Sequence, residues 1–214
     1  MNAHEPAERF DNVIRTEDDL RRVYKQPGTL VQKKVIDRID IHCRQFIEAS
    51  PFLVVATRHP DGYMDVSPRG DPAGFVAVLD EKTLAIPDRP GNNRLDTLTN
   101  LLADPEIGLI FMIPTKRETL RVGGRATITT DDGLRERLAH KGKPPLSVIV
   151  VSVDRALFQC SKCMVRSGLW DPEKWPEKLD LAPLAVVASD HTGLSLPLES
   201  VEEAIEDSIR NKLY

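Results

Sequence analysis

The stretch AIPDRPGNNRLDTLTNLLADP, residues 85–105, changes from one type of secondary structure to another within a short distance. It begins at the end of an apolar run typical of a β-strand and passes through a turn rich in Pro, Gly and Asn at residues 87–93. A helix is predicted to begin near Arg94, with Asn92 or Asn93 as its cap. Because the first turn of a helix carries unpaired N–H groups and a partial positive charge, this junction is a candidate site for an anion such as a phosphate.

Short apolar runs on both sides of this stretch predict further β-strands. The runs lie at residues 52–57, 63–66, 75–79, 83–86, 107–113, 119–130 and 147–153. Residues 59–62 have the composition of a hairpin turn, and the Gly123-Gly124 pair indicates a bulge, a barrel corner or a close approach by a ligand. Because hairpin turns connect short strands, we predict the α+β class: a mostly antiparallel sheet closed as a barrel, with helices outside it.

Helices are predicted before and after the strands. A short helix follows Thr16, whose hydroxyl can cap it, and a longer one covers residues 31–49, where apolar residues recur at helical spacing. Two more are predicted at residues 131–140 and 198–213. The predicted division of the chain is an N-terminal extension at 1–30, a barrel domain at 31–175, and a Pro-rich linker with a terminal helix at 176–214.

The composition excludes several classes of protein. With 214 residues, 41% apolar and 29% charged, the chain suits a compact globular protein, and its net charge of -4 lacks the basic field of a general nucleic-acid binder. The longest apolar run, residues 146–153, is far shorter than the roughly 20 residues of a membrane helix, and the polar N-terminus lacks a signal-peptide core. Three cysteines do not indicate a disulfide framework, so we expect a cytoplasmic protein without nucleic-acid or membrane partners.

Ser67 and Arg69 form a second candidate cluster, at the end of a predicted strand. A hydroxyl and a guanidinium at such a position can point toward one ligand, and the fork-shaped donors of Arg94 suit a phosphate. The residues alone leave another interpretation open. In it, Asp71 neutralises Arg69 at the surface, and Arg94 is a solvated side chain beside an ordinary capped helix.

The segment LFQCSKCMVRSGLWDPEKW, residues 157–175, is dense in chemically active side chains. Cys160 and Cys163 have the spacing of a redox dithiol or of half a zinc site, but no second pair with CxxC or HxxxH spacing accompanies them, so no metal site is predicted. Arg166 and Trp170 could approach a planar ring, or the indole could pack on the barrel rim. Motifs such as GxSxG, HExxH, GxGxxG or a Walker loop are missing from the sequence, which favours chemistry supplied by a cofactor.

Five motifs in a fixed order carry a family resemblance. They are SPRGDPAGF (67–75), IPDRPGNNRLDTL (86–98), DPEIGLIFMIP (104–114), ETLRVGGRA (118–126) and CSKCMVRSGLW (160–170). In these, the chain resembles the pyridoxamine 5'-phosphate oxidase-like, FMN-binding split-barrel superfamily, and within it the branch of FMN-dependent enzymes of the pyridoxamine phosphate oxidase class. The resemblance covers about residues 30–175 and implies a split β-barrel, a homodimer, and FMN bound in clefts between the subunits.

The resemblance also implies three groups of cofactor-binding residues. The group expected at the FMN phosphate is Ser67, Arg69, Asn93 and Arg94. The group expected against the isoalloxazine ring, at a strand end, is Ile86, Pro87 and Asp88. The group expected to approach the ring from the other subunit is Arg166 and Trp170.

Departures from the oxidase argue against pyridoxamine phosphate as the substrate. Residues 67–71 replace the oxidase's arginine, apolar run and lysine; Asn93-Arg94 replaces its consecutive Arg and Lys; and no Arg-x-His pair follows Trp170. The resemblance therefore implies an FMN-dependent oxidoreductase that passes a hydride through flavin N5 to or from an unidentified small organic substrate, with NAD(P)H as a candidate reductant. Two alternatives stay open: a flavin-binding carrier or sensor without turnover, and a related split barrel that holds haem or a deazaflavin.

Overall fold

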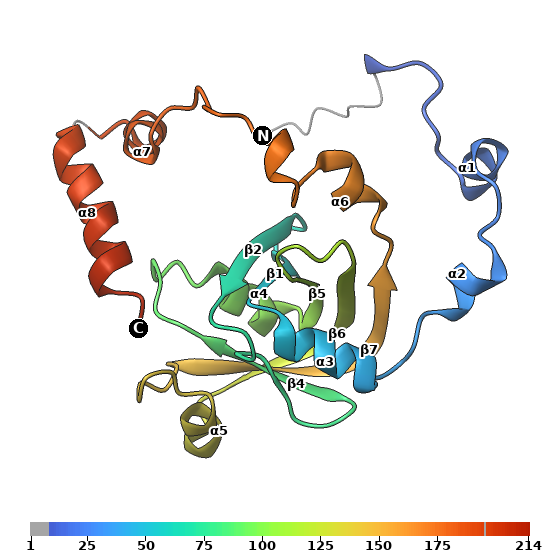
Figure 1. Cartoon of the computed structure of the whole chain (residues 1–214), viewed down its shortest axis with the longest axis horizontal. Helices are drawn as coiled ribbons and strands as arrows, with labels where there is room; N and C mark the ends of the chain where they lie inside the picture. Colours follow the sequence, from blue (N-terminus) through green and yellow to red (C-terminus); the bar gives the residue numbers. More distant parts are fainter. Residues whose placement is uncertain (1–8, 195) are drawn as a thin grey trace. The chain divides into compact units, whose positions relative to one another are not determined.

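The protein is described by a computed structural model of residues 9–194 and 196–214 (Figure 1). The chain divides into two compact units, and the boundary between them in the sequence falls between Val35 and Ile36. The first unit contains α1 (Glu17–Val23) and α2 (Thr29–Lys33), and neither helix buries a side chain. The predicted cap of α1 is confirmed, since Thr16 Oγ1 accepts a hydrogen bond from the backbone N–H of Asp19 at 3.1 Å.

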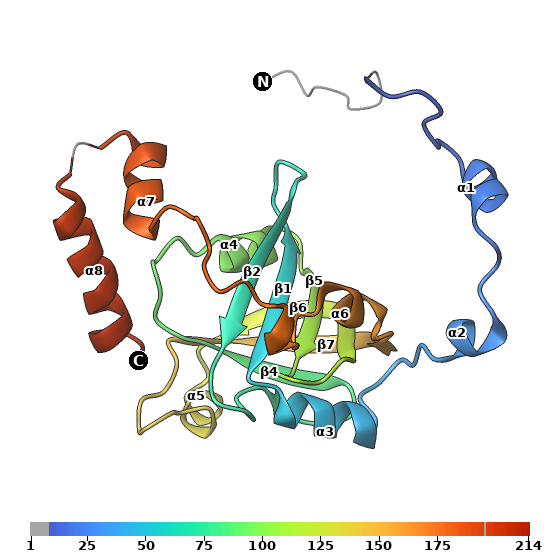
Figure 2. The same cartoon turned by 45° about the horizontal axis from the view of Figure 1, so that its top comes forward.

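The second unit is built around an antiparallel sheet. Its strands are β1 (Phe52–Arg58), β2 (Met64–Gly70), β3 (Ala77–Val78), β4 (Thr83–Asp88), β5 (Glu106–Met112), β6 (Thr119–Thr129) and β7 (Ser147–Gln159). The strand order β2-β1-β5-β6-β7-β4-β3 leaves β2 and β3 at the edges, and β1, β2 and β5 run steeply across β4 in Figures 1 and 2. The predicted α+β fold and its antiparallel sheet are confirmed. The sheet is not closed, which agrees with the split barrel that the resemblance implies and not with the closed barrel expected from the hairpin turns alone.

The hydrophobic core lies between the inner face of this sheet and α3 (Ile41–Ala49). On β1 and β5 every second residue is buried, as expected for strands with one face toward a core. The helix contributes Cys43 and Ile47, and the sheet contributes large side chains such as Leu53 and Phe111. The alternate residues of β1 and β5, on the opposite face of the sheet, are only partly buried or exposed.

The single long helix predicted at residues 31–49 is wrong. The backbone instead leaves α2 after Lys33, and Ile36 pairs with Ala156 of β7 through two hydrogen bonds of 3.0 and 2.7 Å. A new helix, α3, then begins behind Asp40, whose carboxylate accepts a hydrogen bond from Cys43 N at 2.8 Å. Apolar spacing continued through this break, and pairing with a distant strand overrode it.

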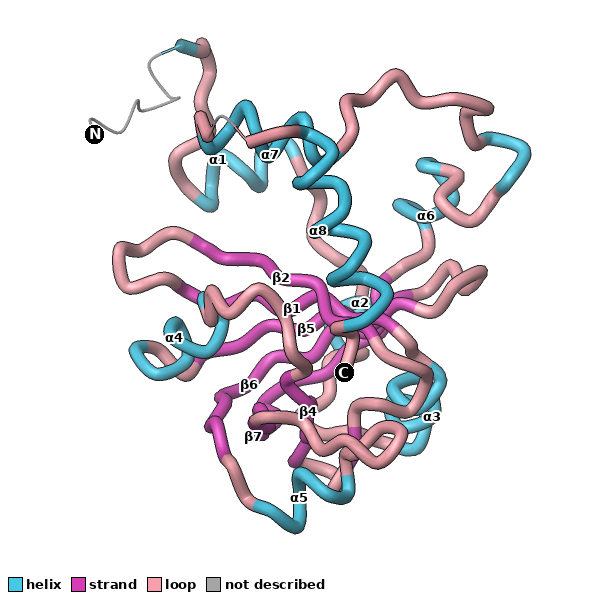
Figure 3. Tube along the Cα trace, turned by 90° about the vertical axis from the view of Figure 1, so that its left-hand side faces the viewer, coloured by secondary structure: helices cyan, strands magenta, loops and turns pink. Residues whose placement is uncertain are grey.

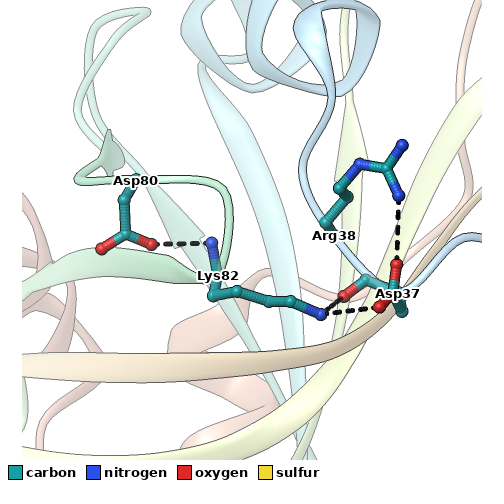
Figure 4. A network of polar contacts seen from close by, with 4 residues as sticks. All are labelled: Asp37, Arg38, Asp80 and Lys82. Atoms are coloured by element: carbon teal, nitrogen blue, oxygen red, sulfur yellow. Dashed lines mark hydrogen bonds and ion pairs between the residues drawn. The ribbon is translucent and has the colours of Figure 1, made fainter.

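A polar network joins the segment before α3 to the turn between β3 and β4 (Figure 4). The Lys82 ammonium contacts the backbone oxygen of Asp37 and lies 3.0 Å from its carboxylate, while Asp80 accepts the Lys82 backbone N–H at 2.7 Å. The hydrogen bond from Lys82 lowers the pKa of Asp37, which also pairs with Arg38 at 3.3 Å. Because the network is exposed, it positions this segment more than it stabilises the fold.

Two helices flank the sheet where the chain crosses between strands. α4 (Asp96–Ala103) contacts β1, β2 and β6, and α5 (Asp132–Arg137) packs near β7. The predicted cap of α5 is confirmed, because Asp131 accepts a hydrogen bond from Leu134 N at 2.8 Å. The helix ends three residues before the predicted His140.

The chain beyond β7 contains α6 (Lys162–Ser167), the short 3-10 helix η2 (Pro172–Lys174), α7 (Leu184–Thr192) and α8 (Leu198–Asn211). Helix α8 was predicted, whereas α7 falls within the predicted Pro-rich linker. The two helices pack against each other and run side by side in Figures 2 and 3. Within the described ranges, no helix combines the length and apolar content needed to cross a membrane.

Candidate functional site

A pocket of about 410 Å³ lies where β2, the end of β4 and the start of α4 meet. Its lining consists of residues 65–69, residues 88–98 and Leu146. Five of the predicted cofactor-binding residues share this lining: Ser67, Arg69, Asp88, Asn93 and Arg94. The two motifs that were expected to hold a phosphate are therefore adjacent in space.

Strand β2 extends to Gly70, farther than the predicted end at Val66. Because side chains alternate along a strand, Asp65, Ser67 and Arg69 share one half-buried face that lines the pocket. An Nη of Arg69 donates a hydrogen bond to Ser67 Oγ at 3.1 Å. The buried Nε of Arg69 finds no hydrogen-bond acceptor among residues 9–194 and 196–214.

Asp88 ends β4 and faces Arg69 across the pocket wall. Its carboxylate lies 3.6 Å from the guanidinium, and its side chain is 15% exposed. Burial raises the pKa of Asp88, and the charge of Arg69 only partly opposes this rise. The pair is therefore looser than a fully formed buried ion pair, and Arg69 keeps donor capacity for another acceptor.

The loop between β4 and α4 does not use the predicted cap. Asn92 Oδ1 accepts the Arg94 backbone N–H at 3.1 Å, and the cap position belongs to Leu95, whose side chain cannot accept a hydrogen bond. Asn93 and Leu95 both have left-handed backbones, with φ of 58° and 61°. Since Asp96 and the next residues of α4 line the pocket, the first turn of this helix faces it without a side-chain cap.

Arg94 lies at the solvent side of the pocket. Its side chain is 72% exposed and pairs with Asp96 at 2.7 Å. Arg89, which was not predicted as a site residue, is instead largely buried: its side chain is 15% exposed and pairs with Asp71 at 2.7 Å. Asp71 therefore neutralises Arg89 and not Arg69, contrary to the alternative left open above. The sequence could have indicated Arg89, because it lies in the same motif, residues 86–98, as Arg94.

The remaining predicted site residues lie elsewhere. Ile86 and Pro87 are buried in β4, paired with β7, and neither lines the pocket. Arg166 is exposed on α6. Trp170 lines a second pocket of about 350 Å³ together with residues such as Arg117. Within one chain, the structure thus brings together the four residues expected at the phosphate, and of the residues expected at the ring only Asp88 lines the same pocket.

The cysteines fall into two environments. Cys160 and Cys163 are exposed around the start of α6, whereas Cys43 is 1% exposed in the core, where burial raises the pKa of its thiol to about 12. In the part of the chain that the structure describes, no cluster of three or more His, Cys, Asp or Glu side chains could hold a metal ion.

These environments predict selective thiol reactivity. At mildly alkaline pH, a chromogenic aromatic disulfide should react rapidly with Cys160 and Cys163 and should reach Cys43 only after denaturation, because the thiolate is the reacting form. The absorbance released before and after adding denaturant measures both classes. A double Cys160→Ser/Cys163→Ser variant is the control and should show no rapid phase; a rapid phase in it would contradict the buried position of Cys43.

The sequence also matches a family model. The model for pyridoxamine 5'-phosphate oxidase matches residues 39–160, more than half of the chain, and spans every strand of the sheet and the whole first pocket. The chain belongs to the pyridoxamine 5'-phosphate oxidase family. This membership confirms the family that the five motifs indicated. Among curated protein sequences, none gives a significant match.

The chain also matches solved structures at low sequence identity. HupZ of Group A Streptococcus is 18% identical and covers 55% of this chain and 91% of its own, with a TM-score of 0.46. A protein related to general stress protein 26, from Clostridium acetobutylicum, is 17% identical over 56% of this chain and 86% of its own (TM-score 0.42). The conserved protein Rv2991 of Mycobacterium tuberculosis is 14% identical over 75% of this chain and 99% of its own (TM-score 0.44).

Proposed function

We propose that the chain is an FMN-binding oxidoreductase that acts on a small organic substrate other than pyridoxamine phosphate. In this proposal the pocket between β2 and α4 holds the FMN phosphate. Arg69 and Ser67 bind it from β2, while Asn93, Arg94 and the first turn of α4 bind it from the opposite side.

One observation carries this proposal: the guanidinium of Arg69. It is 26% exposed at the pocket wall, its Nε has no acceptor within the described ranges, and its ion pair with Asp88 is 3.6 Å long. A buried donor without an acceptor costs free energy, on the order of 1–3 kcal/mol. A phosphate oxygen would supply the missing acceptor, so the residues present fit an anionic group at this position.

The acidic residues of the pocket limit which anion can bind. Asp65, Asp88 and Asp96 all line it, and two of them pair with arginines. Burial raises the pKa of Asp88, and the charge of Arg69 opposes this rise. The balance of charges favours an anion held by several directed hydrogen bonds over non-specific attraction to a basic surface.

When bound, FMN would supply hydride transfer, and the protein would supply binding, orientation and exclusion of water. Asp88 stands at the strand end between the phosphate residues and buried Ile86 and Pro87, so this strand end is where the ring is expected. Arg166 and Trp170 lie outside the pocket of their own chain. We therefore propose a homodimer in which these two residues approach the ring from the second subunit. No side chain is assigned as an acid or a base.

The visible spectrum of the purified protein, followed by titration of the apoprotein with FMN, tests the proposal. Absorption maxima at about 370 and 450 nm, as oxidised flavins show, and quenching of FMN fluorescence are the expected results. A Soret band, or an apoprotein that takes up no FMN, would overturn the assignment. Reduction by NADH or NADPH and reoxidation by candidate acceptors then separate an oxidoreductase from a carrier, which would show no turnover.

A further inference from the structure

Tyr214, beyond the end of α8, is anchored beside the loop that follows β4. Its hydroxyl donates a hydrogen bond to Asp71 Oδ1 at 2.5 Å, and its ring stacks on His140 with 4.5 Å between ring centroids. Lys143 donates to its backbone oxygen at 3.0 Å. In Figures 1 and 2 the chain end marked C lies next to this loop, which fits the contacts.

Asp71 links Tyr214 to the pocket. Its side chain is 1% exposed, and its second oxygen accepts a hydrogen bond from Arg89 Nε at 2.7 Å. A carboxylate buried to this degree requires donors to both oxygens. Tyr214 and Arg89 are the donors that these contacts provide, so the hydroxyl of Tyr214 supplies one of the two side-chain hydrogen bonds that the Asp71 carboxylate accepts.

Arg89 is held on three sides. Besides Asp71, an Nη donates to Leu138 O at 3.0 Å, and the guanidinium carbon lies 5.7 Å from the centroid of the Tyr214 ring. Arg89 follows Asp88 directly and lines the same pocket as Arg69 and Arg94. Its anchoring therefore fixes the first residues of the loop from which the pocket is built.

We propose that Tyr214 is a positioning residue of the anion pocket, which holds the loop at residues 88–95 through Asp71 and Arg89 and so couples α8 to anion binding. The expected effect on FMN rests on the function proposed above, whereas the effect on the loop does not. Because coupling free energies are reciprocal, an anion that orders the loop also strengthens the attachment of Tyr214. The last segment of the chain thereby regulates a site to which it contributes no lining residue.

The matched pair Tyr214→Phe and Tyr24→Phe tests the coupling, since each removes one hydroxyl and Tyr24 is an exposed residue outside the barrel unit. Tyr214→Phe should raise the Kd for FMN by about three- to tenfold, the effect of one hydrogen bond, and should leave the Kd for riboflavin, which has no phosphate, unchanged. Tyr24→Phe should change neither. Equal weakening of FMN and riboflavin binding, or no weakening of either, would overturn the proposal.

Hydrogen–deuterium exchange of ligand-free protein tests the loop directly. Peptides covering residues 88–95 should exchange faster in Tyr214→Phe than in the unchanged protein, while peptides from the core strands β5 and β6 should not. Unchanged exchange in the loop would overturn the coupling whatever FMN does. If the unchanged protein fails to bind FMN, the proposed function is wrong, and the exchange result still decides the role of Tyr214.

Discussion

An Arg69→Met variant is expected to bind FMN roughly 30- to 100-fold more weakly than the unchanged protein, a loss of about 2–3 kcal/mol for charge-assisted hydrogen bonds. The side chain is 26% exposed and carries the donor without an acceptor, so its bond to a phosphate would form in a partly desolvated site. Arg94→Ala should cost less, about tenfold, because Arg94 is 72% exposed and already pairs with Asp96. Titration monitored by FMN fluorescence measures both.

Two controls separate a phosphate effect from general damage. Riboflavin binding should be unchanged in Arg69→Met, and Arg125→Met, which removes an exposed arginine of β6, should leave FMN binding intact. Equal losses for FMN and riboflavin would place Arg69 outside the phosphate site.

The unfolding free energy of Arg69→Met should depend on pH more steeply than that of the unchanged protein. Burial holds the pKa of Asp88 above its usual value of 3.8 and Arg69 opposes that rise, so removing Arg69 raises the folded-state pKa further. A carboxyl with a raised folded-state pKa lowers stability as it ionises, and therefore Arg69→Met should lose stability relative to the unchanged protein as pH rises above 3.8. Asp88→Asn in the same background should abolish this slope in urea unfolding.

A Gly124→Ala variant is expected to lose about 3 kcal/mol of unfolding free energy or more, the upper part of the range for overpacked cores. A Cβ at this position would stand 2.0 Å from the backbone oxygen of Ser152 and 3.0 Å from its carbonyl carbon. Backbone atoms of a paired strand cannot move aside without breaking the β6–β7 ladder. Chemical denaturation followed by far-UV circular dichroism measures the loss.

The neighbouring glycine provides the control. At Gly123 the added Cβ would meet Arg155 Nε at 2.8 Å, the far part of a flexible and exposed side chain that can rotate away. Gly123→Ala should therefore cost much less than Gly124→Ala. Equal costs would show that loss of glycine in the strand, and not the contact with Ser152, determines the stability.

The strands and the bulge were predictable because they depend on local patterns. Alternating apolar residues and turn residues located the strands, and the Gly123-Gly124 pair marked the place where the β6–β7 register shifts by one residue. The break before α3 was not predictable, since it depends on the pairing of Ile36 with Ala156, 120 positions away in the sequence. Helix α7 was hidden by the prolines around it.

The candidate site was predictable to the extent that each motif carries its own chemistry. Arg69 and Arg94 were identified as cations near turn and strand ends, and the fold brings them into one pocket. Which of the two contributes more to anion binding could not be predicted, because the exposure of each side chain depends on how the fold packs around it. The contacts of Arg89 could not be predicted either. They involve Asp71, which also binds Tyr214, and nothing in the sequence indicates that these residues meet.

Strand β2 shows how the barrel can stay split without inviting another strand. It is an edge strand that pairs with β1, and it contains Pro68, which lies opposite Val54. A proline has no amide hydrogen to give, so the outer side of β2 lacks a donor where an incoming strand would need one. The open edge at β2 therefore resists growth of the sheet by strand addition.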